Sequence, residues 1–381
     1  MFVDLSSLAS ALQATFSPRW RSPRRVGFTV LCVSAMAAFY LLNVVMRSLD
    51  EILFPGYHKV EIRPPLIVTA NPRSGTTLLH RLISLDEARF TTFRLYHVLF
   101  PSVCLFKLAS LFSRQKSSAP DGPALGGPFR RLALWLKNRI FVRWRGMHLV
   151  GLNTREEDEG LMFFTFASGS LYIVFPYFNE VPAPRFADSL SPRKRRALAH
   201  YYRNCVQRFL YATGPDKTFL MKSVFFVGRM KLMHEVFPDA RVVYLIRNPL
   251  QTLPSFVSMF TALFWKIHSP EIPEDSDEYR QWAKLGIDYY RYFQQNRYIF
   301  GDNNLMIFRY EDLIKSPRAA VIKICRRFGM ELTQKHLTLL EQESESQRKF
   351  KSSHDYSLDR YGLSREWIER ELPQIFESYG F

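Results

Sequence analysis

A short apolar segment that runs through a loop directly into a helical pattern sets the strongest limit on the fold. Leu66–Ala70 (LIVTA) has the β-branched and apolar residues of a buried strand, and residues 77–85 (TLLHRLISL) have helical spacing. The loop between them contains Arg73 and Gly75. A strand, a loop and a helix in this order predict the opening unit of an α/β fold.

A second block of the same kind follows later in the chain. Residues 219–221, Arg241–Ile246 (RVVYLI) and 304–309 (NLMIFR) read as strands, and residues 228–236 and 317–328 read as helices. Strands that alternate with helices are typical of a mostly parallel sheet with helices on both faces. The predicted fold class is therefore α/β, with a P-loop-like central sheet.

The chain divides by composition into four parts. We expect a basic segment at 1–25, an apolar helix at 26–46, a linker at 47–63 and one α/β domain at 64–381. The α/β domain is predicted to carry a helical insertion from about 95 to 215. Within that insertion, a loop rich in Gly, Pro and Ser and a basic amphipathic helix are predicted at residues 113–128 and 129–145.

The loop after the first strand has the properties of an anion site. The start of a helix presents unpaired N–H groups and the positive end of the helix dipole. Gly75 lets the backbone approach an anion, Thr76 and Thr77 add hydroxyl donors, and Arg73 adds charge. An ordinary capped turn would account for the glycine and the threonines but not for the arginine.

This loop departs from the phosphate loop of nucleotide triphosphatases. In the pattern GxxxxGK[ST], the first glycine position is Ala70 here, and the lysine position is Thr76. The strand RVVYLI is followed by Arg247, where such enzymes carry a magnesium-binding Asp. These differences disfavour an ATPase or a kinase.

The segment PRSGTT after a first strand resembles the 5′-phosphosulfate loop of sulfotransferases that use 3′-phosphoadenylyl sulfate (PAPS). It is most similar to the tyrosylprotein and bacterial-type branch, which has Arg at the position of Arg73. The resemblance covers roughly residues 64–379. It implies PAPS as the donor, without a metal, and donor contacts from Arg73, Ser74, Gly75, Thr76 and Thr77.

Three further segments carry the same resemblance. Arg247 with Ser255 eight residues later resembles the family's 3′-phosphate site, and two helical turns bring such a hydroxyl back toward the strand end. Tyr310 lies in a YED segment whose tyrosine is near the adenine in the family. Lys351 lies in a segment that resembles the family's lid over the nucleotide.

Sulfuryl transfer builds negative charge on the bridging oxygen of the leaving nucleotide, and basic groups stabilise that charge without a metal. Arg73 is one candidate for this role. Lys222 is the other, because it lies 25 residues before Arg247, as the family's catalytic lysine does. The four cysteines include no CxxC pair, so neither a zinc site nor a disulfide framework is predicted.

The general base is left open by the sequence. Relatives often carry a histidine shortly after the catalytic lysine, but residues 222–226 read KSVFF here. His97 is the first candidate, because an imidazole titrates near neutral pH, and a packed core histidine is the alternative. Glu157 and Asp158 are the other candidates, and for them the alternative is a solvated helix start.

An excess of basic residues favours anionic partners. The chain has 52 Lys and Arg against 35 Asp and Glu, a formal net charge of +17. No recognisable nucleic-acid motif accompanies this charge, so nucleic acid is not expected as a partner. The rival functions are a P-loop phosphotransferase or kinase and a non-catalytic, membrane-bound nucleotide-binding adaptor.

The apolar segment at 26–46 has the length of a membrane span. Its 21 uncharged residues would extend about 30 Å as a helix. We predict a single-pass N-terminal anchor; a buried core helix and a shallow interfacial helix are the alternatives. The side of the membrane is left open: a Golgi enzyme would have a lumenal domain, and a bacterial enzyme would keep its domain in the cytoplasm at the inner membrane.

The acceptor is the least constrained part of the prediction. Apolar stretches at 99–112, 161–178 and 253–267 are either protein core or the walls of an apolar pocket. The second reading suits an amphiphilic or lipid-linked small molecule. A carbohydrate hydroxyl or an amine also fits the expected chemistry, and the sequence gives no oligomeric state.

Overall fold

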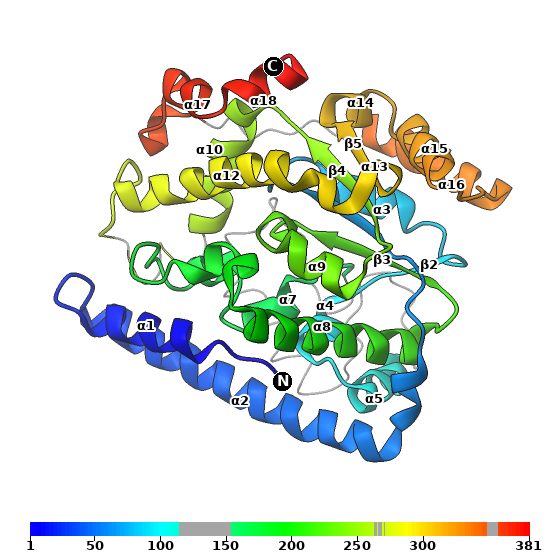
Figure 1. The fold of residues 1–381 in the computed structure, drawn as a ribbon, viewed down its shortest axis with the longest axis horizontal. Coiled ribbons are helices and arrows are strands. Elements are labelled where there is room, and N and C mark those ends of the chain that lie inside the picture. Colours follow the sequence, from blue (N-terminus) through cyan, green and yellow to red (C-terminus); the bar gives the residue numbers. More distant parts are fainter. Residues whose placement is uncertain (114–153, 263–264, 266–268, 270, 349–356) are drawn as a thin grey trace. The chain divides into compact units, whose positions relative to one another are not determined.

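The computed structural model describes residues 1–113, 154–262, 265, 269, 271–348 and 357–381, and in this part of the chain five parallel strands form one sheet (Figure 1). The order of the strands is β2-β3-β1-β4-β5. Their bounds are Leu66–Ala70 for β1, Phe90–Thr91 for β2, Thr218–Ser223 for β3, Arg241–Ile246 for β4 and Leu305–Arg309 for β5.

Helices cover the sheet on both faces. Leu66, Val68 and Ala70 of β1 belong to one hydrophobic core with α3 (Thr76–Ile83) and α15 (Pro317–Arg327). On the opposite face, the ring of Tyr244 in β4 stacks on Phe293 of α12 (Asp277–Asn296) with ring centroids 3.5 Å apart. Every residue of β1 is buried, as expected for a parallel sheet that is covered on two sides.

The predicted secondary structure matches this sheet closely. The strands predicted at 66–70 and 241–246 have the observed bounds, and those at 219–221 and 304–309 correspond to β3 and β5. The strand β2 was not predicted, because a strand of two residues is too short for a periodic pattern. The predicted fold class, an α/β sheet with helices on both faces, is confirmed, and at the predicted N-terminal transmembrane helix the structure has an apolar helix long enough to span a membrane.

The predicted helices differ from the observed ones at their ends. The helix predicted at 77–85 is α3, which begins one residue earlier. The helix predicted at 228–236 consists of a 3₁₀ turn, η6 (Phe226–Arg229), followed by α9 (Met230–Val236). The basic helix predicted at 129–145 lies outside the described residues, as does the loop at 113–128 except for Ser113.

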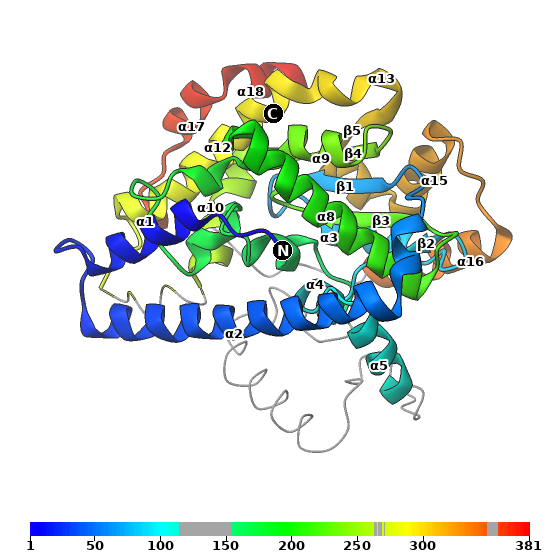
Figure 2. The same cartoon turned by 60° about the horizontal axis from the view of Figure 1, so that its bottom comes forward.

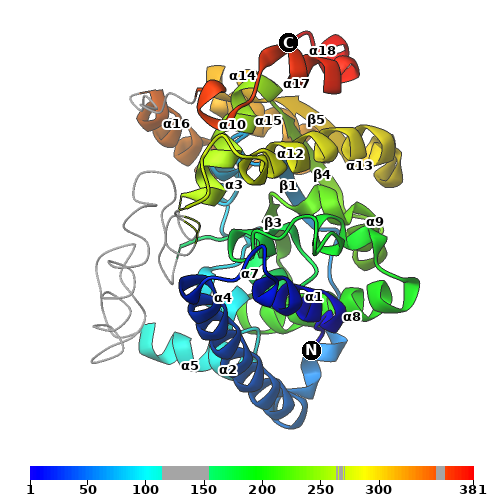
Figure 3. The same cartoon turned by 90° about the vertical axis from the view of Figure 1, so that its left-hand side faces the viewer.

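The described chain divides into two compact units. The sheet belongs to the second unit, which comprises residues 63–92, 217–258 and 273–381. In Figures 1 and 3, α10 (Pro249–Thr261), which lies in this unit up to Ser258, is beside α12, and a Cβ atom at Gly286 would lie 2.5 Å from Leu253. The remaining elements of this unit are η7 (Arg297–Phe300), α13 (Gly301–Asn304), α14 (Tyr310–Lys315), α16 (Gln334–Arg348), η8 (Asp359–Tyr361), α17 (Arg365–Glu371) and α18 (Pro373–Tyr379).

The first unit, residues 1–62, 93–216 and 259–272, is helical in its described part. Its long elements are α1 (Leu5–Phe16), α2 (Pro23–Leu53), α5 (Val103–Ser113) and α8 (Pro192–Thr213). The short ones are η1 (Pro55–Lys59), α4 (Leu95–Leu99), α7 (Glu159–Phe163), η3 (Gly169–Ile173), η4 (Ala183–Arg185) and η5 (Ala187–Ser189).

Of the apolar stretches found in the sequence, 161–178 is largely core of the first unit. Phe166, Leu171, Val174, Phe175 and Tyr177 belong to a buried cluster that also holds residues of α1 and α2. Among the described helices, α2 is the one with the length and apolar composition needed to cross a membrane. Such a helix is weak support for a membrane protein by itself, because a core helix or a signal sequence has the same properties.

Candidate active site

The candidate donor site lies at the carboxyl edge of the sheet. β1 and β4 are neighbours, yet the chain proceeds from β1 to β2 and β3 on one side, and from β4 to β5 on the other. In doubly wound sheets, ligands bind outside the strand ends at such a point. The loop at 71–75 follows β1 and Arg247 follows β4, so both lie at this position.

Two residues of the loop have a left-handed backbone conformation before α3 begins. Arg73 has φ 71° and Gly75 has φ 85°, and Gly75 is the N-cap of α3. No side chain caps the first turn of this eight-residue helix. Its first amide groups therefore keep their hydrogen-bonding capacity for an anion.

Gly75 is also required by the ring of Tyr310. A Cβ atom at Gly75 would lie 2.8 Å from two carbons of that ring, which is closer than real Cβ contacts. The predicted adenine-side tyrosine thus lies directly against the predicted phosphate loop.

The two predicted phosphate segments contact each other through Arg73. Its Nε atom donates a hydrogen bond to Ser255 Oγ at 2.9 Å. Its carbonyl oxygen accepts a hydrogen bond from Arg247 Nη1 at 2.7 Å. Ser255 is buried, and the two arginines are partly exposed. The structure therefore brings two guanidinium groups and a hydroxyl to one place.

Arg247 is held by Tyr310, which the sequence pointed to, and by Tyr290, which it did not. Its guanidinium lies over the Tyr310 ring, 4.1 Å from the centroid. Its carbonyl oxygen accepts a hydrogen bond at 2.8 Å from the hydroxyl of Tyr290, which is also 2.9 Å from Thr252 Oγ1. Tyr290 lies on α12, a helix for which no phosphate motif exists, so no sequence signal could have assigned it to this site.

Lys222 lies near the carboxyl end of β3, and only 1% of it is exposed. Its Nζ atom is 3.3 Å from Oγ1 of Thr77, the second residue of α3. Strand pairing places Lys222 opposite Val68 of β1. The lysine and the phosphate loop thus lie at one edge of the sheet.

The hydrogen-bond donors at this site suit a phosphosulfate ligand. Ser74 is buried in the loop, and its Oγ atom has no hydrogen-bond partner within the described residues. A buried hydroxyl normally has a partner, so this one has capacity for a ligand oxygen. Together with Arg73, Lys222 and the amides of α3, it forms a set of donors with positive charge.

In the described residues, no group of His, Cys, Asp and Glu side chains comes together that could hold a metal ion. Arginine and lysine side chains can supply positive charge at the candidate donor site. The predicted lid residue Lys351 lies outside the described residues.

His97, the first candidate for the base, lies in the first unit inside an aromatic cluster. It is 3% exposed, and its ring is 4.8 Å from the Phe106 ring and 4.7 Å from the Phe209 ring. Its Nδ1 atom accepts a hydrogen bond from the Arg94 amide at 3.0 Å, while Nε2 has no hydrogen-bond partner among the described residues. Burial, reinforced by the charge of Arg94, holds the pKa of His97 well below its usual range.

The acidic run at 156–159 also lies in the first unit, and its members differ in their surroundings. Asp158 is fully buried and accepts a hydrogen bond from the Tyr202 hydroxyl at 2.8 Å. Glu156 accepts one from Thr154 Oγ1 at 3.0 Å. Glu159 accepts hydrogen bonds from Ser168 and Ser170. Glu157 is half-buried, so it retains access to solvent.

Comparison with known proteins identifies the family and the fold. The profile of the Sulfotransferase family matches residues 64–334, a range that contains all five strands described here. Omega-hydroxy-beta-dihydromenaquinone-9 sulfotransferase Stf3 from Mycobacterium bovis is 25% identical over 327 residues, which cover 84% of this chain and 75% of that protein.

Two solved structures share the fold. Sulfotransferase STF9 from Mycobacterium avium has a TM-score of 0.69 at 16% identity and covers 100% of this chain and 97% of that one. STF1 from Mycobacterium tuberculosis H37Rv has a TM-score of 0.66 at 18% identity, with 97% and 92% covered. Since the family profile spans well over half of the chain and includes the phosphate loop, the protein belongs to the sulfotransferase family.

Proposed function

We propose that this PAPS-dependent sulfotransferase transfers the sulfuryl group to a hydroxyl of an amphiphilic or lipid-linked small molecule. The use of PAPS as the donor is supported by the contact of Arg73 with both Ser255 and Arg247 at the carboxyl edge of the sheet. That contact joins the two segments that resemble the family's 5′- and 3′-phosphate sites. A phosphotransferase is not favoured, since the loop lacks the Walker lysine.

The donor would be held at both of its phosphate ends. The amides of α3, with Ser74, Gly75, Thr76 and Thr77, are proposed to hold the 5′-phosphosulfate. Arg247 and Ser255 are proposed to hold the 3′-phosphate, Tyr310 to lie near the adenine, and Lys351 to close over the nucleotide. PAPS supplies an activated sulfuryl group and leaves as adenosine 3′,5′-bisphosphate.

Arg73 and Lys222 are proposed to stabilise the charge that develops on the leaving phosphate. Lys222 is buried at the edge where α3 begins, and a charge in such a place acts more strongly than one in water. Because this stabilisation grows toward the transition state, its loss would lower turnover more than donor affinity.

Glu157 is the base that the geometry favours. A base must reach the acceptor hydroxyl, and Glu157 is the candidate that is partly open to solvent. His97 accepts a backbone hydrogen bond inside an aromatic cluster, and Asp158 is buried against Tyr202. We therefore propose Glu157 as the base and treat His97 and Asp158 as structural residues.

The acceptor proposal rests on similarity and on the apolar surface of the first unit. The relative Stf3 is named for a hydroxylated menaquinone, which is an apolar molecule with one alcohol group. The helix α2 presents an apolar outer face, with Leu31 68% and Leu41 62% exposed. Both observations favour an acceptor that resides in a membrane over a free sugar or an amine.

Membrane attachment through α2 is part of the proposal. The sequence predicts a single-pass anchor, and an interfacial position is the alternative. The side follows the supply of PAPS: a lumenal domain in a Golgi enzyme, or a cytoplasmic domain in a bacterium. Protease protection of residues 60–381 in sealed vesicles of known orientation distinguishes the two sides.

A screen with ³⁵S-labelled PAPS tests the acceptor. The purified full chain is incubated with hydroxylated menaquinone, a sterol, a long-chain alcohol, simple sugars and a tyrosine peptide. We expect label in the first three and not in the sugars or the peptide. Label found only in a sugar or in the peptide would refute the amphiphile, while leaving the donor assignment intact.

A further inference from the structure

The helix α2 carries its polar residues on the face that is buried in the protein. Its buried positions are spaced by four, seven, seven, four and three residues, so they lie on one side of the helix. Five of these six residues are polar or charged: the set is Arg25, Thr29, Met36, Asn43, Arg47 and Asp50. A surface helix of a protein in water normally shows the opposite arrangement.

The outward face of α2 is apolar along its length. Residues 26–46 contain no charged side chain. Large apolar side chains on this face are between 40% and 75% exposed: they are Val30, Leu31, Leu41, Leu42, Val45, Leu49, Ile52 and Leu53. An exposed apolar stripe of this length marks a surface that contacts a partner or a membrane.

Specific contacts fix the N-terminal end of α2 within the first unit. Arg25 is 4% exposed, and its guanidinium donates hydrogen bonds to Ser269 Oγ at 2.8 and 3.0 Å and to the carbonyl oxygen of Trp20 at 2.6 Å. It also pairs with Glu271.

The C-terminal half of α2 is fixed as firmly. Asn43 Nδ2 donates to the carbonyl oxygen of Leu99 at 3.0 Å, and Arg47 Nη1 donates to that of Pro101 at 3.3 Å. Asp50 forms an ion pair at 3.0 Å with Arg208 of α8, and both side chains are at most 1% exposed.

Asp50 has a second role at the start of α5. Its carboxylate accepts hydrogen bonds from the amides of Val103 and Cys104, both at 2.9 Å, and from Ser102 Oγ at 3.0 Å. The two amides are unpaired donors of the first turn of α5, so Asp50 of α2 caps α5. Figure 2 shows α2 as one long helix with α1 beside its first half and α5 near its end.

These contacts conflict with a helix that crosses a bilayer apart from the rest of its unit. They extend from Arg25 to Asp50, which is about 38 Å of helix. If α2 spanned the membrane, either its buried polar residues would lose these partners in lipid, or α5 and α8 would enter the bilayer with it. If α2 lies parallel to the membrane plane, its buried polar residues keep their partners, and α5 and α8 need not enter the bilayer.

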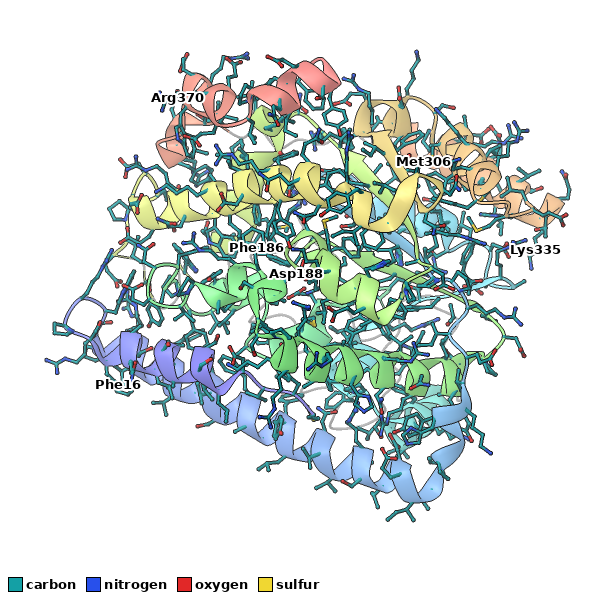
Figure 4. All side chains as sticks on the ribbon, in the orientation of Figure 1. Phe16, Phe186, Asp188, Met306, Lys335 and Arg370 are labelled. Carbon is teal, nitrogen blue, oxygen red and sulfur yellow. The ribbon has the colours of Figure 1, made fainter. Side chains whose placement is uncertain are left out.

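Exposed apolar and charged side chains beside the outward face identify its occupant. On α1, which packs beside α2, Leu5 is 70% and Phe16 is 53% exposed; Figure 4 labels Phe16. Arg19, Arg21 and Arg24 are exposed where the chain enters α2. An apolar face bordered by exposed arginines matches the acyl region and the anionic head groups of a lipid surface.

We propose that the chain is a monotopic membrane protein, in which the outer faces of α1 and α2 lie in the plane of an anionic bilayer. The inside-out distribution of polar residues on α2 follows from this position, because lipid is the outer solvent and the first unit is the polar partner. The proposal concerns lipid alone and does not rest on the acceptor.

Vesicle flotation tests the surface. The purified full chain is mixed with vesicles of phosphatidylcholine containing 30% phosphatidylglycerol, and the double variant Leu31→Asp/Leu41→Asp is compared with Tyr298→Asp. Both replace exposed apolar residues, but Tyr298, 73% exposed, lies in the second unit. We expect at least tenfold weaker vesicle binding for the double variant alone, with unchanged binding of adenosine 3′,5′-bisphosphate.

Two results would overturn the surface assignment. One is a double variant that floats like the parent. The other is a parent chain that ignores vesicles and forms a dimer that the double variant abolishes, which would make the face an interface between copies of this chain.

Tag accessibility tests the in-plane position. The full chain carries a protease-cleavable tag at each end and is expressed in membranes that are then prepared as sealed vesicles. We expect protease to cleave both tags or neither, because both ends lie on one side of the bilayer. Cleavage of one tag, with the other cleaved only after detergent is added, would establish a spanning helix and refute the monotopic position.

Discussion

Arg247 Nη1 donates a hydrogen bond to the carbonyl oxygen of Arg73 at 2.7 Å, so the residue that follows β4 holds the loop that follows β1. Arg73 is in the left-handed region, with φ 71°, and this bond helps to hold it there. The two halves of the proposed donor site are thus joined by a hydrogen bond. A change at either arginine is expected to affect both ends of the donor.

Arg247→Ala should weaken the binding of adenosine 3′,5′-bisphosphate by about 10- to 100-fold. The variant loses a charge-assisted contact, of about 1.5–3 kcal/mol, together with the stacking on Tyr310. Isothermal titration calorimetry measures the change. The control is Arg370→Ala, an exposed arginine on α17 that Figure 4 labels, and equal affinities of the two variants would dismiss the 3′-phosphate role.

Gly75→Ala should lower both stability and donor affinity, because the new Cβ would lie 2.8 Å from the Tyr310 ring at a φ of 85°. Gly329→Ala is a matched control: its φ is 64°, and nothing lies within 4 Å of the new Cβ. Thermal unfolding of both variants therefore separates the clash from the backbone strain. Equal losses in the two variants would mean that contact with Tyr310 is unimportant.

His97 should make the folded protein less stable as the pH falls. The folded-state pKa of His97 is lowered by burial and by Arg94, so the unfolded chain binds the proton first. The free energy of unfolding should therefore decrease as the pH drops below about 6.5. This pH dependence should be smaller in His97→Asn, and it should persist in Phe106→Leu, which disturbs the same cluster without removing a titrating group. A parental slope in His97→Asn would contradict the assignment.

Glu157→Gln should reduce turnover by about 100-fold or more while donor affinity stays within about threefold, the signature of a lost base. Glu61→Gln, at an exposed glutamate of the segment before the sheet, should have parental kinetics. His97→Asn, if it folds, should retain most of the turnover. The reverse result, with His97→Asn inactive and Glu157→Gln active, would return the base to the histidine.

The sheet and the phosphate segments could be predicted because their signals are local. The strands β1 and β4 are short runs of apolar residues bounded by Pro65, Asn71 and Arg247, and their shortness and β-branched residues favour strands over buried helices. Gly75 and Arg73 are adjacent in sequence to the helix start that they serve. The prediction for Arg247 and Ser255 rested on the resemblance to the sulfotransferase family, and their spacing of two helical turns agrees with it.

The features that could not be predicted from the sequence depend on contacts between distant segments. Tyr290 supports Arg247 from α12, 43 residues away in the chain, and nothing in its local sequence indicates this. The surroundings of His97 are set by Phe209, which lies more than a hundred residues later. The length of α2 predicts a membrane span, whereas the proposed in-plane position rests on the partners of Arg25 and Asp50, which the hydropathy pattern does not reveal.

The most direct test of the sulfotransfer account is the rate at which Lys222→Met transfers ³⁵S from labelled PAPS to an acceptor found in the screen. Methionine keeps the volume of the buried side chain and removes its charge, and Lys315→Met on the outside of α14 is the control. We predict that turnover falls by about 100-fold or more, with affinity for adenosine 3′,5′-bisphosphate within about threefold of the parent. Parental turnover in Lys222→Met would contradict the role of this lysine, and a parent chain that transfers no label from PAPS to any acceptor would contradict the account as a whole.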